Sequence, residues 1–78
     1  NESAFNIYPN PVNDRLYIET EGGIEEVSVF DIFGRKQEIS AVSHQLSVID
    51  VSNLNSGIYF IKINTIDNGE IVKRFVKK

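Results

Sequence analysis

Residues 50–63 read DVSNLNSGIYFIKI, and the second half of this stretch is the densest run of β-branched and aromatic residues in the chain. Residues of these two kinds favour strands, so positions 57–63 are predicted to form one. Side chains alternate between the two faces of a strand, which places Tyr59, Ile61 and Ile63 on one face. Ile58 and Phe60 then lie on the other. Apolar side chains on both faces suit a strand that is covered on each side, or a strand between a core and a partner.

The first half of the same stretch turns the chain into this strand. Its turn-forming residues are Asn53, Asn55, Ser56 and Gly57, and a single apolar residue, Leu54, lies among them. A Leu, a tight turn and a Tyr near the start of a strand resemble the tyrosine corner of immunoglobulin-like sandwiches. In a corner, the Tyr59 ring lies in the core and its hydroxyl bonds the upstream backbone. The alternative is an ordinary hairpin in which this Tyr has no special role.

The rest of the chain repeats short apolar–polar alternations separated by turn signals. The expected strands cover residues 5–8, 15–19, 27–30, 37–42, 46–51, 57–63 and 71–76. Gly34 suits a left-handed turn position, and Asp67-Asn68-Gly69 is a hairpin signal before the last strand. About seven short strands with turn signals roughly every 8–12 residues predict an all-β fold, an immunoglobulin-like antiparallel β-sandwich.

The alternation also predicts which side chains form the core. The expected core residues are Leu16, Ile18, Val27, Val29, Leu46, Val48, Leu54, Tyr59, Ile61 and Ile63. In the 46–51 strand, Ile49 and Val51 fall on the face opposite Leu46 and Val48. Whether the side chains of Phe30, Phe60 and Phe75 point into the core is left open, because their strands are apolar on both faces.

Charge divides the chain into an acidic body and a basic end. All eleven acidic residues precede residue 73, and the same part of the chain contains only four basic residues. This body therefore carries a net charge of −7. The last six residues carry +4 through Lys73, Arg74, Lys77 and Lys78. Four cations on so acidic a body do not support nucleic-acid binding.

No catalytic or cofactor-binding constellation is visible in the sequence. The chain has no Cys, which excludes disulfides and thiolate metal sites. Its one histidine, His44, sits between Ser and Gln in an expected loop, without the neighbours of a zinc site or a catalytic triad. We therefore expect a solvated histidine, no metal or cofactor, and a domain that is not an enzyme.

Four motifs carry a resemblance to a known family: Tyr8-Pro9-Asn10-Pro11, Asp31-Ile32-Phe33-Gly34, residues 49–63, and Lys73-Arg74-Phe75-Val76-Lys77-Lys78. In this order and spacing they resemble the type A C-terminal sorting domain of type IX (Por) secretion cargo. The resemblance covers residues 5–78, expected to be the sorting domain, and residues 1–4 are expected to be the remnant of a linker.

The resemblance implies a secretion signal without catalytic activity. The parent would be a secreted protein of a Gram-negative bacterium that passes through the periplasm to the cell surface or the extracellular space. The implied partners are the outer-membrane type IX translocon, shuttle proteins and a cell-surface sortase that removes the domain and attaches the cargo to the surface. Motif residues expected to act mainly in folding are Pro9, Asn10, Pro11, Gly34, Asp50, Leu54, Gly57 and Tyr59. Residues expected to be recognised by the translocon or sortase are Lys73, Arg74, Phe75, Val76, Lys77 and Lys78.

The basic end supports two interpretations. Cations on a terminal edge strand can simply prevent edge-to-edge pairing. Alternatively, they form a handle that a receptor grips by strand addition or charge pairing, which the resemblance favours. A homodimer through edge strands is left open. So are two other functions for the whole domain, a structural spacer and a carbohydrate-binding module, although the chain has no Trp.

Overall fold

Eight strands and no helix make up the part of the chain that the computed structural model describes, residues 6–20, 22–42, 45–66 and 69–78. The strands are β1 (Asn6–Tyr8), β2 (Arg15–Glu19), β3 (Ile24–Asp31), β4 (Lys36–Gln37), β5 (Ser40–Val42), β6 (Gln45–Asp50), β7 (Gly57–Thr65) and β8 (Gly69–Lys77). These segments therefore contain no helix that could cross a membrane.

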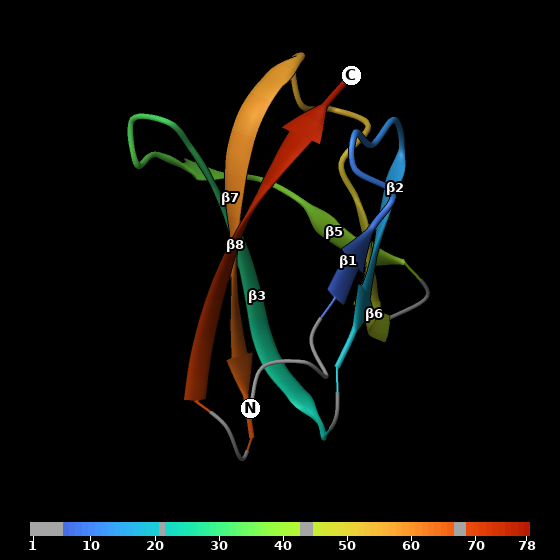
Figure 1. Ribbon diagram of the computed structural model, residues 1–78, viewed down its shortest axis with the longest axis vertical. Coiled ribbons are helices and arrows are strands. Elements are labelled where there is room, and N and C mark those ends of the chain that lie inside the picture. The colour runs from blue at the N-terminus through green and yellow to red at the C-terminus, as the bar shows by residue number, and fades with distance from the viewer. Residues whose placement is uncertain (1–5, 21, 43–44, 67–68) are drawn as a thin grey trace.

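The strands form two antiparallel sheets that face each other (Figure 1). One sheet has the order β1-β2-β6-β5 and the other the order β4-β3-β7-β8. The predicted all-β sandwich is confirmed. In the second sheet, β7 and β8 pair along their whole length as a long hairpin, as the turn signal predicted. Two of the residues in that signal, Asp67 and Asn68, lie outside the described residues, as does His44.

Strand β7 occupies the centre of its sheet, between β3 and β8. Its predicted faces are confirmed: Tyr59, Ile61 and Ile63 are buried, whereas Ile58 and Phe60 point away from the core and are 42% and 37% exposed. The strict alternation of β7 thus supplies one wall of the core and also leaves apolar side chains on the outer face of the sheet.

The core lies between the sheets, and it corrects the predicted orientation of β6. Leu46 and Val48 were expected inside but are only partly buried, whereas Ile49 and Val51 are almost fully buried. Register explains the difference: Ile49 lies directly opposite Leu16, which points inward, and opposite residues of paired strands share a face. Among the described residues, the buried apolar side chains are Ile7, Val12, Leu16, Ile18, Val29, Ile49, Val51, Leu54, Tyr59, Ile61, Ile63 and Phe75. Of the three phenylalanines left open, only Phe75 belongs to this set.

The single strand predicted for residues 37–42 is wrong. The chain forms β4 against β3 in one sheet, then crosses and forms β5 against β6 in the other. Ile39, at the crossing, packs against the core while the backbone leaves the first sheet. This change of sheet gives eight strands in place of about seven.

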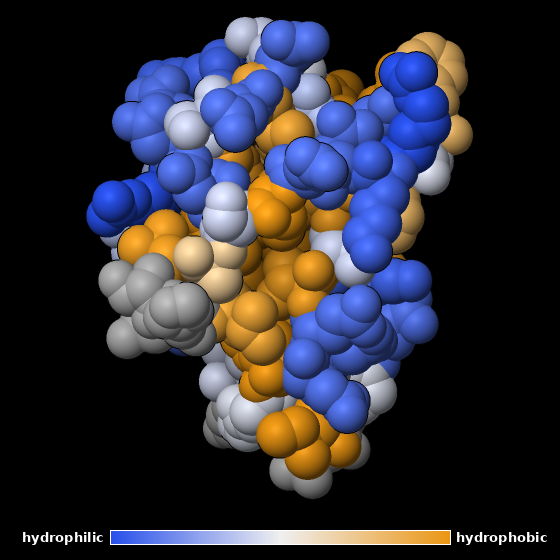
Figure 2. Space-filling model, turned by 180° about the vertical axis from the view of Figure 1, so that it is seen from behind, coloured by the Kyte–Doolittle hydropathy of each residue, from blue (hydrophilic) through white to orange (hydrophobic). Residues whose placement is uncertain are grey.

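The face turned away from the viewer of Figure 1 shows an apolar strip between polar margins (Figure 2).

Candidate functional site

The turn before β7 is a tyrosine corner, as predicted. The Tyr59 ring is 7% exposed, and its hydroxyl donates a 2.8 Å hydrogen bond to the carbonyl oxygen of Asn55. Leu54 is buried beneath the turn, and its amide donates to the carbonyl of Val51. Gly57 has a φ of 153°, a conformation that residues with a Cβ rarely adopt. These residues fix the direction in which β7 enters the sheet.

Asp50 stabilises the beginning of the same turn. Its carboxylate accepts hydrogen bonds from the Ser52 hydroxyl at 2.6 Å and from the Ser52 amide at 2.9 Å. These two bonds, together with the positive charge of Arg15 on the paired strand β2, lower the pKa of Asp50. Both bonds of Asp50 are therefore made within the turn itself.

The Pro9-Asn10-Pro11 segment lies against the C-terminal strand, 64 to 66 residues away along the chain. The Asn10 side chain accepts a hydrogen bond from the Val76 amide at 2.8 Å and donates a longer one, 3.5 Å, to the Arg74 carbonyl. Val12 follows and forms a parallel bridge: its amide donates to the Val76 carbonyl, and its carbonyl accepts from the Lys78 amide, at 2.8 and 2.9 Å. We call this contact between the two ends of the domain the terminal junction.

The terminal junction occupies the outer edge of β8 over its last residues. The carbonyl of Arg74, the amide and carbonyl of Val76 and the amide of Lys78, which would pair with an added strand, are already bonded to Asn10 and Val12. A receptor strand, or the edge strand of a second copy, therefore cannot pair there while the junction is intact. Charge pairing is the mode of recognition that this part of β8 leaves open.

The six residues of the predicted handle fall into two groups. Phe75 is fully buried, with its ring stacked on Tyr59 at 5.8 Å between centroids. Lys77 is only 8% exposed, and its ammonium group donates to the carbonyl of Lys78. By contrast, the remaining four residues offer side-chain surface: Lys73, Arg74 and Lys78 are exposed, and Val76 is partly buried.

The turn between β3 and β4 is built around Asp31. One carboxylate oxygen accepts hydrogen bonds from the amides of Phe33 and Arg35, and the other contacts the Arg35 guanidinium at 2.8 Å. Partial desolvation alone would raise the pKa of Asp31, but these bonds and the charge of Arg35 lower it. Gly34 has the predicted left-handed conformation, with a φ of 83°. The turn places Ile32 and Phe33 at its tip, 60% and 76% exposed, an exposure that sequence reasoning missed although both are apolar residues in a turn.

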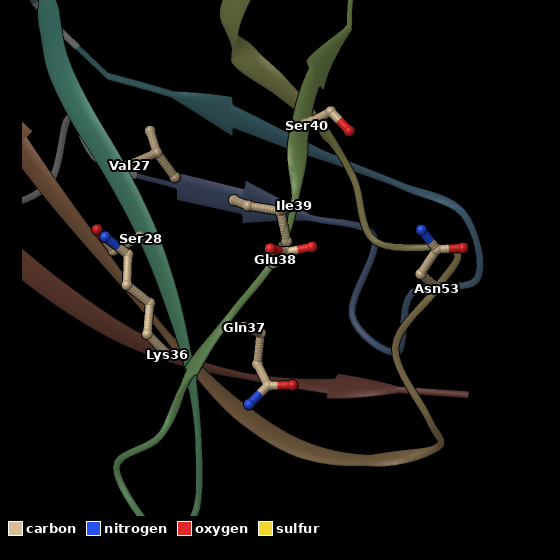
Figure 3. Close-up of a pocket in the computed structure, with 8 residues that line it drawn as sticks. All are labelled: Val27, Ser28, Lys36, Gln37, Glu38, Ile39, Ser40 and Asn53. Atoms are coloured by element: carbon tan, nitrogen blue, oxygen red, sulfur yellow. The ribbon is translucent and has the colours of Figure 1, made fainter.

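A shallow cleft of about 610 Å³ lies beside the crossing from β4 to β5 (Figure 3). Val27 and Ile39 give it an apolar part, and Gln37, Glu38 and Asn53 give it a polar part. Within the described ranges, no group of three His, Cys, Asp or Glu side chains could hold a metal ion. Ser28, Lys36 and Ser40 complete the lining of the cleft.

Two tyrosines form an exposed pair on the outer face of the β1-β2-β6-β5 sheet. Tyr8 and Tyr17 lie opposite each other on β1 and β2, and their rings stack at 5.6 Å between centroids with 10° between the planes. They are 46% and 37% exposed. Cross-strand aromatic pairs of this kind stabilise the pairing of two strands.

Comparison with known proteins identifies the architecture built from these motifs. No curated protein matches the chain significantly. A family model described as the secretion system C-terminal sorting domain matches residues 6–78, which include all four motifs and both sides of the terminal junction. The chain therefore belongs to the family of C-terminal sorting domains of type IX secretion.

Proposed function

We propose that the chain is a non-catalytic address that directs its parent protein through the type IX machinery across the outer membrane. A cell-surface sortase then removes the domain and attaches the parent protein to the surface. Family membership supports the role in secretion, and sorting domains are in general not catalysts. The observation that carries the proposal is the terminal junction, which holds the motif-bearing C-terminal strand on the sandwich. The signal is then a surface of the folded domain and not a loose tail.

Recognition is assigned to the part of the C-terminal strand that reaches solvent. Lys73, Arg74 and Lys78 offer charge, and Val76 offers a small apolar surface on the same face of β8 as Arg74. Phe75 and Lys77 act indirectly, because their side chains are buried and keep β8 in place. The motif residues of the corner and the junction support this surface without contacting the partner.

The proposed partners are the outer-membrane translocon, shuttle proteins and the sortase, met during transit through the periplasm of a Gram-negative bacterium. The proposed domain comprises residues 5–78, and residues 1–4 are the remnant of a linker to the parent. The start of the family match at residue 6 supports this boundary. Two copies that pair through edge strands would have to do so away from the terminal junction.

The test changes the exposed cations without touching the core. Deleting the last four residues would also remove Phe75, so unfolding and loss of recognition would be confused. We would instead introduce Lys73→Gln, Arg74→Gln and Lys78→Gln together into the full-length parent in its host. The periplasm, cell surface and medium would then be assayed for the parent protein. Arg15→Gln, on the other sheet, is the control for loss of a cation.

We expect the wild type and Arg15→Gln to reach the surface, and the triple variant to accumulate in the periplasm while still melting cooperatively. Normal export of the triple variant would show that these cations are only edge protection. If the wild type reached the surface in a strain that lacks a functional translocon, the secretion proposal itself would fail, and a spacer would become the better interpretation.

A carbohydrate-binding module is the second candidate, and the Tyr8–Tyr17 pair is the observation that favours it. Exposed aromatic rings can stack on sugar rings, and the flanking strand positions carry polar side chains such as Asn6 and Glu19. Glycan-array binding that is lost in Tyr17→Ala would support this function. The absence of binding at millimolar oligosaccharide would leave the pair as a device for holding β1 on β2.

A further inference from the structure

The Asp31–Gly34 turn and the beginning of β7 expose a contiguous apolar surface. It consists of Ile32, Phe33, Ile58 and Phe60, which are 60%, 76%, 42% and 37% exposed. We call it the apical surface. A groove of about 360 Å³ separates the turn from the start of β7, and Ile32, Phe33 and Ile58 all line it. Phe60 continues the surface because it lies two residues after Ile58 on the same face of β7. Contiguous apolar patches on soluble proteins commonly mark interaction sites.

The apical surface is held in place before any partner arrives. Asp31 accepts two backbone amides of the turn, and the Arg35 guanidinium lies over the Phe33 ring, 5.3 Å from its centroid. These contacts fix a ring that makes little contribution to the core. A partner that binds a preorganised ring loses less conformational entropy than one that binds a mobile loop.

Positive charge flanks the apical surface on both sides of Phe60, although the chain as a whole carries −3. Arg74 lies directly opposite Phe60, and Lys36 lies opposite Phe30, the neighbour of Phe60 on β3. Nearby carboxylates are already engaged: Asp31 with Arg35, and Glu70 with Lys62 at 3.9 Å. The surface is therefore apolar at its centre and cationic at its margins.

The apical surface also adjoins the proposed recognition strand. Ile58 pairs with Val76, and Gly57 pairs with Lys77, so the groove opens beside the last residues of β8. A partner that contacts Arg74 and Val76 would meet Ile58 and Phe60 on the neighbouring strand.

We propose that the apical surface docks a protein segment of the type IX machinery that carries apolar side chains flanked by carboxylates. One of these apolar side chains inserts into the groove. This inference rests on the proposed function and extends recognition from β8 to the turn and to β7. Charge complementarity selects this partner. A second copy docked by two-fold symmetry would bring cationic margins of the same kind together.

The first experiment substitutes Phe33 in the full-length parent in its host. Phe33 is so exposed that its replacement should leave the melting temperature unchanged. Phe33→Ser should reduce export about tenfold or more, because burial of an aromatic ring supplies about that factor. Phe33→Glu should reduce it further than Phe33→Lys, since the partner is acidic. The control is Ile66→Ser: Ile66 is 66% exposed but lies at the opposite end of β7, and this variant should be exported normally.

The second experiment identifies what touches the surface. A photoreactive p-benzoylphenylalanine replaces Phe33 or, as the control, Ile66. The position-33 probe should cross-link to a protein component of the type IX machinery in living cells, and the position-66 probe should not. Cross-links only to a second copy or to lipid would overturn the proposal, as would equal export of the Glu and Lys variants.

The two proposals fail in different ways. If export of the wild type depends on the translocon but every Phe33 variant is exported normally, only the apical surface loses its role. If export of the wild type is independent of the translocon, the secretion proposal fails, and this inference fails with it.

Discussion

The hydroxyl of Tyr59 offers the sharpest test of how the sequence builds this fold. It donates a 2.8 Å hydrogen bond to the carbonyl of Asn55 from a ring that is 7% exposed. The substitution Tyr59→Phe removes one oxygen atom and keeps the ring, including its stack on Phe75. The change in stability therefore reports on the corner bond and not on packing.

The expected cost follows from the surroundings of the bond. Asn55 is exposed, so water can replace the lost donor at its carbonyl, and the cost stays near the net value of one hydrogen bond, about 0.5–1.5 kcal/mol. In a domain of this size, a loss of about 1 kcal/mol lowers the melting temperature by roughly 4–8 °C. Because an isolated domain of 78 residues is only marginally stable, this change is easily measured.

Thermal and urea unfolding of the wild type, Tyr59→Phe and Tyr17→Phe would provide the comparison. Tyr17 is the matched control, since it is 37% exposed on the outer face of the other sheet. Of the two variants, we expect only Tyr59→Phe to lower the unfolding midpoint. The slope of the unfolding free energy with urea concentration should be unchanged. If Tyr59→Phe melted with the wild type, the corner bond would contribute nothing, and the Tyr would be an ordinary core residue.

Three further predictions concern the same framework. Gly57→Val should cost on the order of 1–3 kcal/mol, because a residue with a Cβ is strained at a φ of 153° even though open space surrounds it; an unchanged urea midpoint would contradict this. Phe75→Ala should cost about 3–5 kcal/mol and leave much of the domain unfolded, whereas Lys78→Ala should melt with the wild type in calorimetry. Asp31 and Asp50 have a pKa lowered from 3.8, so their stabilising effect is complete above that value and is lost as the pH falls through their lower folded-state values. As the pH is lowered, the melting temperature of Asp31→Asn and of Asp50→Asn should therefore fall less steeply than that of the wild type. If all three melting temperatures fell equally with pH, these two carboxylates would not stabilise the folded state.

The sequence predicted features whose causes are local. Strict alternation gave the correct faces of β7, and the special chemistry of Gly57 and Tyr59 marked the corner. The predicted orientation of β6 was wrong because both faces of this strand are apolar. Alternation alone therefore cannot decide whether Val48 or Ile49 points into the core. That choice depends on register with β2, a contact between strands far apart in the chain.

The candidate site was predictable only in part for the same reason. The sequence shows that the end is basic, but charges fall on both faces of β8, and the pattern does not reveal that Lys77 points to the buried side. Nor does a single sequence show that Asn10 bonds the backbone of Arg74 and Val76. The composition of the basic end was therefore predictable, and its division into surface and core was not.

The terminal junction also determines how the domain responds to mechanical force. The segment around Val12 and the end of β8 run parallel, so a pull that separates residue 6 from residue 78 slides the two segments past each other. The bonds of Val12 to Val76 and Lys78, and of Asn10 to Val76, then bear the load together instead of opening one after another. A pull on the parent protein against a tethered sorting domain would therefore load these bonds in shear.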